Sequence, residues 1–253
     1  MKKPLAIGGA VLGVLLAAAL VIFIFFPGLP TYITAKHKYK DINRTVPDFV
    51  REEVPDSFKQ HTLRDVAVSL PSDWKAHSAI EGIEPGSYRS TDEDSMILVT
   101  KHDRASYDLI SSSEYLSDLN VWESYDYSED DYRHFFDKLG CEYPDLWFYE
   151  WMIWLQRDGY TAKDCIRLRG KDLKVFRELA AEKSECFELE RSWRFGGEDF
   201  YGYIGQLTGM GYDGKLWTCA MVPYGSEDTY YAVSLRCSDE AAARQILSSI
   251  HLK

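Results

Sequence analysis

The segment from Leu5 to Phe26, LAIGGAVLGVLLAAALVIFIFF, constrains the fold more than any other part of the sequence. It contains no charged residue, and as a helix it is long enough to cross the ~30 Å hydrocarbon core of a bilayer. Two lysines precede it, as in a secretory signal, but the run ends in bulky phenylalanines and prolines instead of a small-residue cleavage site. We therefore expect a short head over residues 1–4 and a retained transmembrane signal anchor over residues 5–27. Cleavage near Ala35 is the alternative.

The basic residues beside this segment bear on its orientation. The positive-inside rule compares lysines and arginines within ~15–20 residues of each end of a span. A head of four residues is easily held in the cytoplasm, so we expect a single-pass protein of the cell membrane whose globular part is extracytoplasmic. The basic residues on the far side favour the opposite orientation; they are Lys36, Lys38, Lys40 and Arg44.

Charge is unevenly distributed along the chain. The whole chain has a formal net charge of −11, and residues 46–253 hold 23 basic and 39 acidic residues. Such a domain repels nucleic acid and anionic lipid beyond the Debye length. We expect no nucleic-acid partner. The basic stretch at 36–44 either lies against lipid headgroups, each cation contributing about 1 kcal/mol, or is an ordinary spacer.

After the apolar run, a change in composition near residue 60 divides the rest of the chain into two parts. Residues 28–60 are polar and interrupted by prolines, which disfavour helices, so we expect a juxtamembrane tether. Residues 61–253 have the composition of one packed α+β domain, long enough for a sizeable core. Within it, a helical insertion is expected at about residues 105–185.

Alternation and capping signals predict the elements of this domain. Strands are expected at 66–70, 88–90, 96–100, 187–195, 200–207, 215–222 and 229–236. A helix should begin after Ser128 and stop at Gly140, a second should begin at Pro144, and a third should cover about 171–183. A closing helix capped by Ser238 should follow the last strand.

Two stretches resemble a known family. The strand ending in VSLPSDW and the closing YYAVSLRCSDEAAARQILSSIHL are similar to the PsbP-like superfamily, over roughly residues 62–100 and 214–252. The resemblance implies an antiparallel sheet layered with helices, an α/β/α sandwich, often membrane-tethered and serving in assembly or binding. It implies no shared catalytic set, so no functional residue is carried over.

No nucleotide-binding, metal-binding or catalytic motif in the sequence has the spacing or the neighbouring elements that its function requires. The stretch GMGYDG at 209–214 matches G-x-G-x-x-G, but a β-like segment follows it instead of a helix, so we interpret it as a hairpin turn. The acidic stretch 123–132 lacks the ligand spacing and turn glycine of a calcium loop. No histidine pair has metal-ligand spacing, and no nucleophile elbow is present. We expect no cofactor and no metal.

Five cysteines are dispersed along the chain without a C-x-x-C pair, which does not support a zinc ribbon or thioredoxin chemistry. Cys219 and Cys237 flank an expected hairpin and could face each other across it. Buried free thiols that pack as small hydrophobic groups are the favoured interpretation.

The aromatic segment at 144–158 is the most distinctive candidate for function. Apolar residues cover nearly its whole circumference, so such a helix must be buried on several sides or must meet a partner. We expect Trp151 to be core and Trp147 to be more exposed. The candidate partner-binding residues are Trp147, Phe148, Trp151 and Trp154.

These observations together favour a non-catalytic binding or assembly module of the cell envelope, anchored in the lipid bilayer by residues 5–27, with an envelope protein as a candidate partner. Two alternatives stay open. One is an envelope hydrolase whose active site is assembled from distant residues, and the other is a toxin-neutralising or secretion-accessory protein.

Overall fold

A computed structural model describes residues 3–77, 86–104, 127–140, 159–209, 211–226 and 228–253, with the backbone alone over residues 3–11 and at residue 129. Contacts divide the chain into two compact units. The helical unit comprises residues 1–45, 121–146 and 151–185, and the strand-rich unit comprises residues 46–120, 147–150 and 186–253. The chain is α+β with antiparallel sheets, as the sequence predicts.

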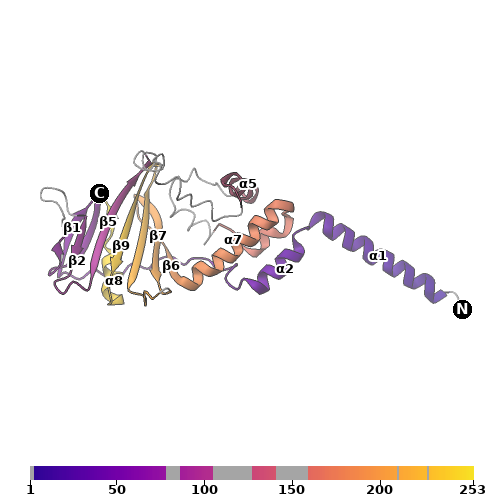
Figure 1. Ribbon diagram of the computed structural model, residues 1–253, viewed down its shortest axis with the longest axis horizontal. Coiled ribbons are helices and arrows are strands. Elements are labelled where there is room, and N and C mark those ends of the chain that lie inside the picture. The colour runs from indigo at the N-terminus through magenta and orange to yellow at the C-terminus, as the bar shows by residue number, and fades with distance from the viewer. Residues whose placement is uncertain (1–2, 78–85, 105–126, 141–158, 210, 227) are drawn as a thin grey trace. The chain divides into compact units, whose positions relative to one another are not determined.

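The strand-rich unit contains two antiparallel sheets (Figure 1). The smaller sheet has the order β1 (Phe58–Leu63), β2 (Val66–Pro71), β10 (His251–Leu252). The larger has the order β3 (Lys75–Ala76), β4 (Ser87–Arg89), β5 (Met96–Asp103), β9 (Thr229–Arg236), β8 (Leu216–Pro223), β7 (Phe200–Leu207), β6 (Glu190–Gly196). The turn at 208–215 joins two antiparallel neighbours, which confirms the hairpin interpretation of the glycine motif.

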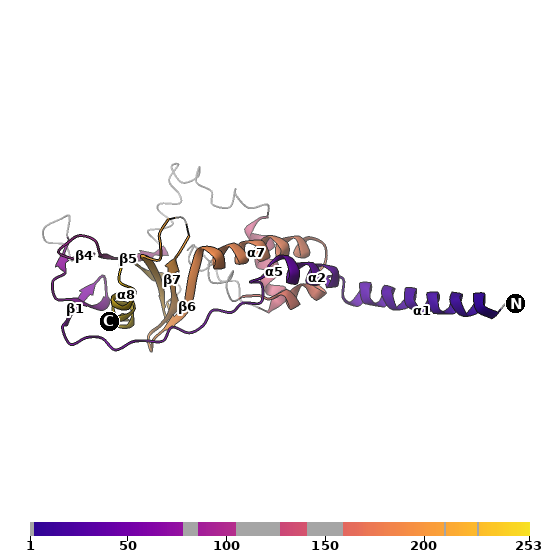
Figure 2. The same cartoon turned by 90° about the horizontal axis from the view of Figure 1, so that it is seen from below.

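Alternation along the strands places one row of apolar side chains in a shared core. Val99, Val233, Cys219 and Ile204 are register partners across β5, β9, β8 and β7, and all four are buried. Helix α8 (Glu240–Ser248) adds Ile246 and other apolar side chains to the same core, and Figure 2 shows it beside the large sheet. Successive residues on a strand face opposite sides, so the core needs only every second residue to be apolar.

The helical unit contains α1 (Lys3–Phe25), α2 (Leu29–Lys38), α5 (Glu129–Leu139), the 3₁₀ helix η2 (Ala162–Arg167) and most of α7 (Gly170–Leu189). Its separate core gathers aromatic and aliphatic side chains, among them Tyr132, Phe135, Phe136, Tyr160 and Phe176. The termini of α5 are those predicted, because Ser128 and Asp131 form a capping box and Gly140 ends the helix at φ 71°.

Three elements differ from the expected ones. Helix α7 continues to Leu189 and so takes the first three residues of the strand expected at 187–195. The side chain that caps α8 belongs to Asp239, not Ser238. Within the stretch expected as a tether, residues Leu29–Lys38 form α2, with Pro30 in its first turn and Thr31 and Ala35 buried.

The single span expected over residues 5–27 is not confirmed. Over the part of the chain whose side chains are described, which begins at Leu12, no single helix is both long and apolar enough to cross a membrane. Leu12–Phe25 and Leu29–Lys38 are long and apolar enough only as a pair, bent by 75°.

Candidate functional site

The sequence-predicted partner-binding residues Trp147, Phe148, Trp151 and Trp154 lie outside the described residues. Their assignment stays a prediction. The described residues offer three other places to consider: the junction of α1 with α2, a polar cluster beside the β1–β2 turn, and an arginine cluster on α8.

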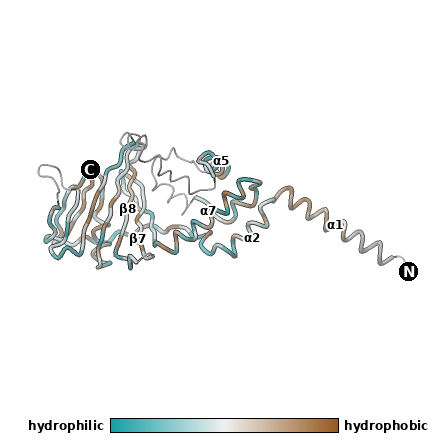
Figure 3. The backbone as a smooth tube through the Cα atoms, in the orientation of Figure 1, coloured by the Kyte–Doolittle hydropathy of each residue, from teal (hydrophilic) through white to brown (hydrophobic). Residues whose placement is uncertain are grey.

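At the junction, an exposed apolar helix, α1, meets packed elements of the helical unit, α2 and η2. Large apolar side chains between Leu12 and Phe26 are 41–69% exposed, and Figure 3 shows the brown colour of α1 as it approaches α2. Exposed apolar surface of this extent on a folded protein marks a surface made for a partner or a membrane.

Backbone contacts fix the end of α1 to the helical unit. The Gly28 amide donates to the Ile166 carbonyl at 2.9 Å, and the Arg169 guanidinium donates to the Ile24 carbonyl in the last turn of α1. A Cβ at position 28 would lie 1.7 Å from the Cys165 carbonyl oxygen. Only glycine permits this approach, so η2 packs closely on the segment that joins the end of α1 to α2.

A carboxylate, an ammonium group and a phenol meet at the β1–β2 turn. Lys101 Nζ and Tyr231 Oη donate to the same Asp65 carboxylate oxygen at 2.8 and 3.2 Å. The hydrogen bond from Lys101 holds the pKa of Asp65 below its usual value, and the same bond raises the pKa of Lys101. Burial raises the pKa of Tyr231. A general base or acid works best with a pKa near the working pH, and these shifts move all three groups away from it, so the cluster fits an ion pair that fastens the hairpin.

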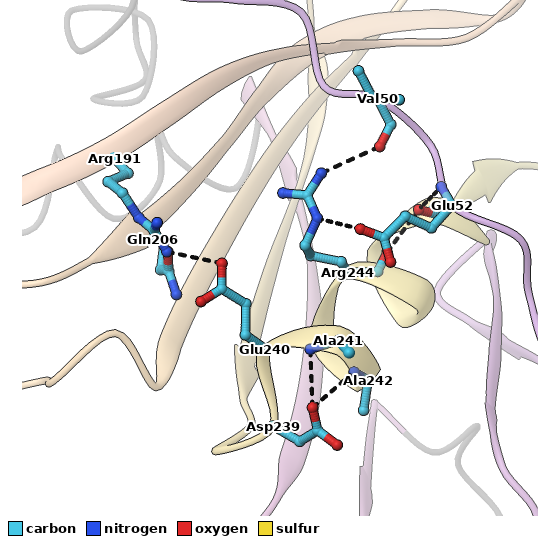
Figure 4. Close-up of polar contacts among 10 residues, drawn as sticks. Val50, Glu52, Arg191, Gln206, Asp239, Glu240, Ala241, Ala242 and Arg244 are labelled. Carbon is cyan, nitrogen blue, oxygen red and sulfur yellow. Dashed lines mark hydrogen bonds and ion pairs between the residues drawn. The ribbon is translucent and has the colours of Figure 1, made fainter.

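The arginine cluster fastens residues 46–53 to α8. Arg244 contacts the Val50 carbonyl and the Glu52 carboxylate, as Figure 4 shows. Arg51 donates to the carbonyls of Ser248, Ile250 and Gly196 at 2.5, 3.1 and 3.2 Å. Partial burial lowers the pKa of Arg51. These cations contact carbonyls at a helix end or a neighbouring carboxylate, which is a stabilising arrangement.

A further arginine of the same cluster, Arg191, connects α8 to the large sheet. Arg191 contacts Gln206 and Glu240, and it lies over the Trp193 ring. Trp193 stacks on the fully buried Trp217 at 5.7 Å between ring centroids. The sequence did not reveal this cluster, because the contacts that join residues 50–52 to positions 244–250 span more than 190 residues.

Cys165, Cys219 and Cys237 are buried free thiols, as favoured from the sequence, and Cys186 is half-buried. Cys219 is paired in register with Val233, and the Cys237 amide bonds to the Lys215 carbonyl, so the two thiols do not face each other across the hairpin. Burial raises the pKa of Cys165 to about 11, and it also raises the pKa of Cys219 and of Cys237. Thiols in this state are poor nucleophiles.

The part of the chain that the structure describes holds no group of three or more His, Cys, Asp or Glu residues able to bind a metal ion. Of the three places, the junction of α1 with α2 is therefore the one that exposes a large apolar surface to its surroundings. The sequence predicted the apolar helix but not the contacts that hold its end and the following segment to Arg169 and η2. Gly28 and Pro30 were the available signals, since glycine suits close approach and proline is accepted in a first helical turn.

Comparison with known proteins gives little further guidance. No protein-family model matches the chain, and no curated protein matches it. Among solved structures, the chain is similar to the solution structure of cyanobacterial PsbP (CyanoP) from Synechocystis, with 13% identity and a TM-score of 0.30, over 79% of this chain and 94% of that chain. At this identity and TM-score, neither a family nor a function follows for this chain.

Proposed function

We propose that the chain is a membrane-anchored, non-catalytic binding or assembly module of the cell envelope. The observation that carries the proposal is the exposed apolar surface of α1 on a helix whose end is held by the packed helical unit. In this proposal α1 enters the bilayer and holds both units at the membrane.

The dimensions of α1 support insertion. Its 23 residues, at a rise of ~1.5 Å each, reach roughly 35 Å, which exceeds the ~30 Å hydrocarbon core. Its side chains from Leu12 to Phe26 carry no charge. Leaving them in water is unfavourable by about 25 cal/mol for each Å² of apolar surface, and lipid chains remove that penalty.

A binding role is favoured over catalysis by the state of the polar clusters. The Asp65 cluster has pKa shifts that move it away from proton transfer, and the described buried thiols are held protonated. These groups fasten secondary structure elements together. A scaffold that presents surfaces to an envelope protein would use its polar groups in this way.

Attachment is tested on the full-length chain by alkaline carbonate extraction of membranes. We expect the wild type to stay in the pellet. A Leu16→Arg variant should be released at least tenfold more readily, because an arginine at a helix centre costs about 2.5–3.5 kcal/mol on insertion. Leu16→Phe is the matched control and should stay in the pellet. Complete release of the wild type would overturn the proposal.

The location of the globular units is proposed to be extracytoplasmic, and an impermeant thiol reagent tests it. Ser57 is exposed and accepts an engineered cysteine. The background should carry Cys186→Ser and Cys141→Ser, since Cys186 is half-buried and Cys141 lies outside the described residues, whereas Cys165, Cys219 and Cys237 are buried. We expect Ser57→Cys to be labelled in intact cells. Labelling only after lysis would place the units in the cytoplasm and leave the anchor itself standing.

The non-catalytic part of the proposal has its own test. Purified full-length protein in detergent is assayed on a broad hydrolase panel, and we expect no turnover. Turnover that disappears on replacing a single histidine or aspartate would contradict a purely binding role.

A further inference from the structure

We infer that four basic side chains around the end of α1 bind the phosphate groups of anionic phospholipids. These are Lys36, Arg167, Arg169 and Arg177, called here the basic collar. The inference rests on the proposed insertion of α1 and adds a lipid class to it.

The position of the collar follows from contacts within the helical unit. Arg169 donates to the Ile24 carbonyl in the last turn of α1. Arg177 donates to the Thr31 hydroxyl in the first turn of α2 at 2.8 Å. Arg167 is adjacent to Ile166, whose carbonyl accepts the Gly28 amide. The guanidinium groups of Arg169 and Arg177, and the backbone next to Arg167, therefore lie along the short stretch where the apolar helix ends. This stretch is at the depth of the lipid phosphates if α1 is inserted.

The collar is not neutralised by the chain's own acids. Among the described residues, no carboxylate lies within ion-pair distance of any collar side chain, and all four residues are exposed. Nearby cations of the same unit are paired, Lys138 with Asp172 and Lys171 with Asp131. The whole chain has 40 acidic and 29 basic residues, so a group of cations without carboxylate partners is a local excess of positive charge on a negatively charged protein.

The segments around the collar also have a net positive charge. Residues 28–45 and 162–177, which meet where α2 packs on η2, together hold ten lysines or arginines and three aspartates or glutamates. The rest of the chain is strongly acidic, so a long polyanion such as nucleic acid would be repelled. An anionic surface presented only at the end of α1 would contact this basic region first.

Helix α2 has the form of an element that lies along such a surface. It bends by 75° from α1, so it would run nearly parallel to the bilayer if α1 crosses it steeply. Thr31 and Ala35 are buried, whereas Ile33 is 53% exposed and Lys36 is exposed. An apolar side chain beside a lysine suits the boundary between acyl chains and headgroups. Guanidinium groups match phosphate oxygens in a two-pronged geometry.

The test measures lipid preference by competition during insertion, because α1 itself should insert into any fluid bilayer and should not exchange between vesicles afterwards. Full-length protein in detergent is diluted below the critical micelle concentration into an equal mixture of phosphatidylcholine vesicles and vesicles containing phosphatidylglycerol, of distinguishable density. After insertion, the distribution of the protein between the two vesicle types is measured at low and high salt. We expect at least a tenfold preference for the anionic vesicles at low salt, which falls as salt screens the charges.

Three variants assign the preference to the collar. The triple variant Arg167→Gln, Arg169→Gln, Arg177→Gln should lose it, since each basic group near an anionic surface is worth roughly fivefold in affinity. The same three positions changed to Lys should keep most of it, which also shows that the sites tolerate substitution. The charge-matched control Lys59→Gln, Lys75→Gln, Lys215→Gln, at exposed positions of the strand-rich unit, should behave as the wild type.

The outcomes separate this inference from the proposed function. Wild type that inserts equally into both vesicle types, or a glutamine variant that keeps the preference, overturns the collar and leaves the anchor standing. Wild type that enters neither vesicle overturns the anchor and the collar together. Loss of the preference with inorganic phosphate, but not with chloride of equal ionic strength, would assign the collar to free phosphate and contradict a lipid site.

Discussion

The α8 cluster of the strand-rich unit and the α1–α2 junction of the helical unit use their arginines differently. In the strand-rich unit, Arg51 and Arg244 contact carbonyls and a carboxylate of their own unit and so hold residues 46–53 on α8. At the α1–α2 junction, Arg169 and Arg177 each contact one carbonyl or hydroxyl and face no described carboxylate. Charge that is matched internally stabilises a fold, whereas charge left unmatched beside an apolar surface is available to a partner.

The largest expected effect concerns the core of the strand-rich unit. Trp217 is fully buried and stacks on Trp193. Trp217→Ala should lower the free energy of unfolding by about 3–5 kcal/mol, measured by urea denaturation in detergent. Trp217→Phe, which keeps an aromatic ring, should lose clearly less. An alanine variant with the stability of the wild type would mean that this core does not hold the unit together.

Arg51 and Arg169 allow the same substitution to be compared at two helix ends. Arg51→Met removes hydrogen bonds to three carbonyls and should lower the free energy of unfolding by about 2 kcal/mol. Arg169→Met removes a contact to one carbonyl and should change the free energy of unfolding by less than about 0.5 kcal/mol. The two measurements are urea midpoints under identical conditions. Equal losses would remove the distinction between the two units.

A substitution at Gly28 tests how closely η2 must pack against the segment that follows α1. Gly28→Ala would bring a methyl group against the Cys165 carbonyl and should cost about 1–3 kcal/mol through overpacking. Gly13→Ala is the matched control within α1, because a Cβ there meets nothing within 4 Å. Thermal melting of both variants checks the expectation, and a Gly28→Ala melt that overlays the control would show that α2 and η2 are loosely joined.

The smallest effect is expected at Asp65, and it depends on pH. The pKa of Asp65 is lowered in the folded protein, so its contribution is present above the ordinary carboxyl pKa near ~4 and is lost as the pH falls through the lowered value. The pair with Lys101 is exposed, so Asp65→Asn should cost less than about 1 kcal/mol at pH 7. Urea midpoints of the wild type and variant should converge in acid, and a gap that widens there would contradict the ion pair.

Strands and helix ends were the parts of the fold that could be predicted from the sequence. Alternation from Met96 onward predicted a half-buried strand, and Ser128 and Gly140 marked both ends of α5. These signals are local, because they depend on side-chain periodicity and on the backbone groups at one helix end. The β1 strand was missed because FKQHTL has one buried residue, Leu63, and no strict alternation.

The structure of the junction could not be predicted, because its determinants are distant in sequence or contradict a simple rule. Prolines near residue 30 indicated a break, yet Pro30 occupies a first helical turn, where its missing amide is not needed. The contact of Arg169 with Ile24 joins positions 145 residues apart. Spacing alone does not reveal that two such segments meet.

The strand-rich unit is built from the two ends of its chain, and this has a consequence for biosynthesis. Residue His251 pairs with Ala67, and Arg51 contacts carbonyls 197 and 199 residues further on. Such a unit has a high contact order, so it folds more slowly than one made of local contacts. Its small sheet and its α8 clamp can form only after residues 244–252 have been translated. Residues of α1 leave the ribosome before them, so if α1 inserts as proposed, it can enter the membrane before this sheet is complete.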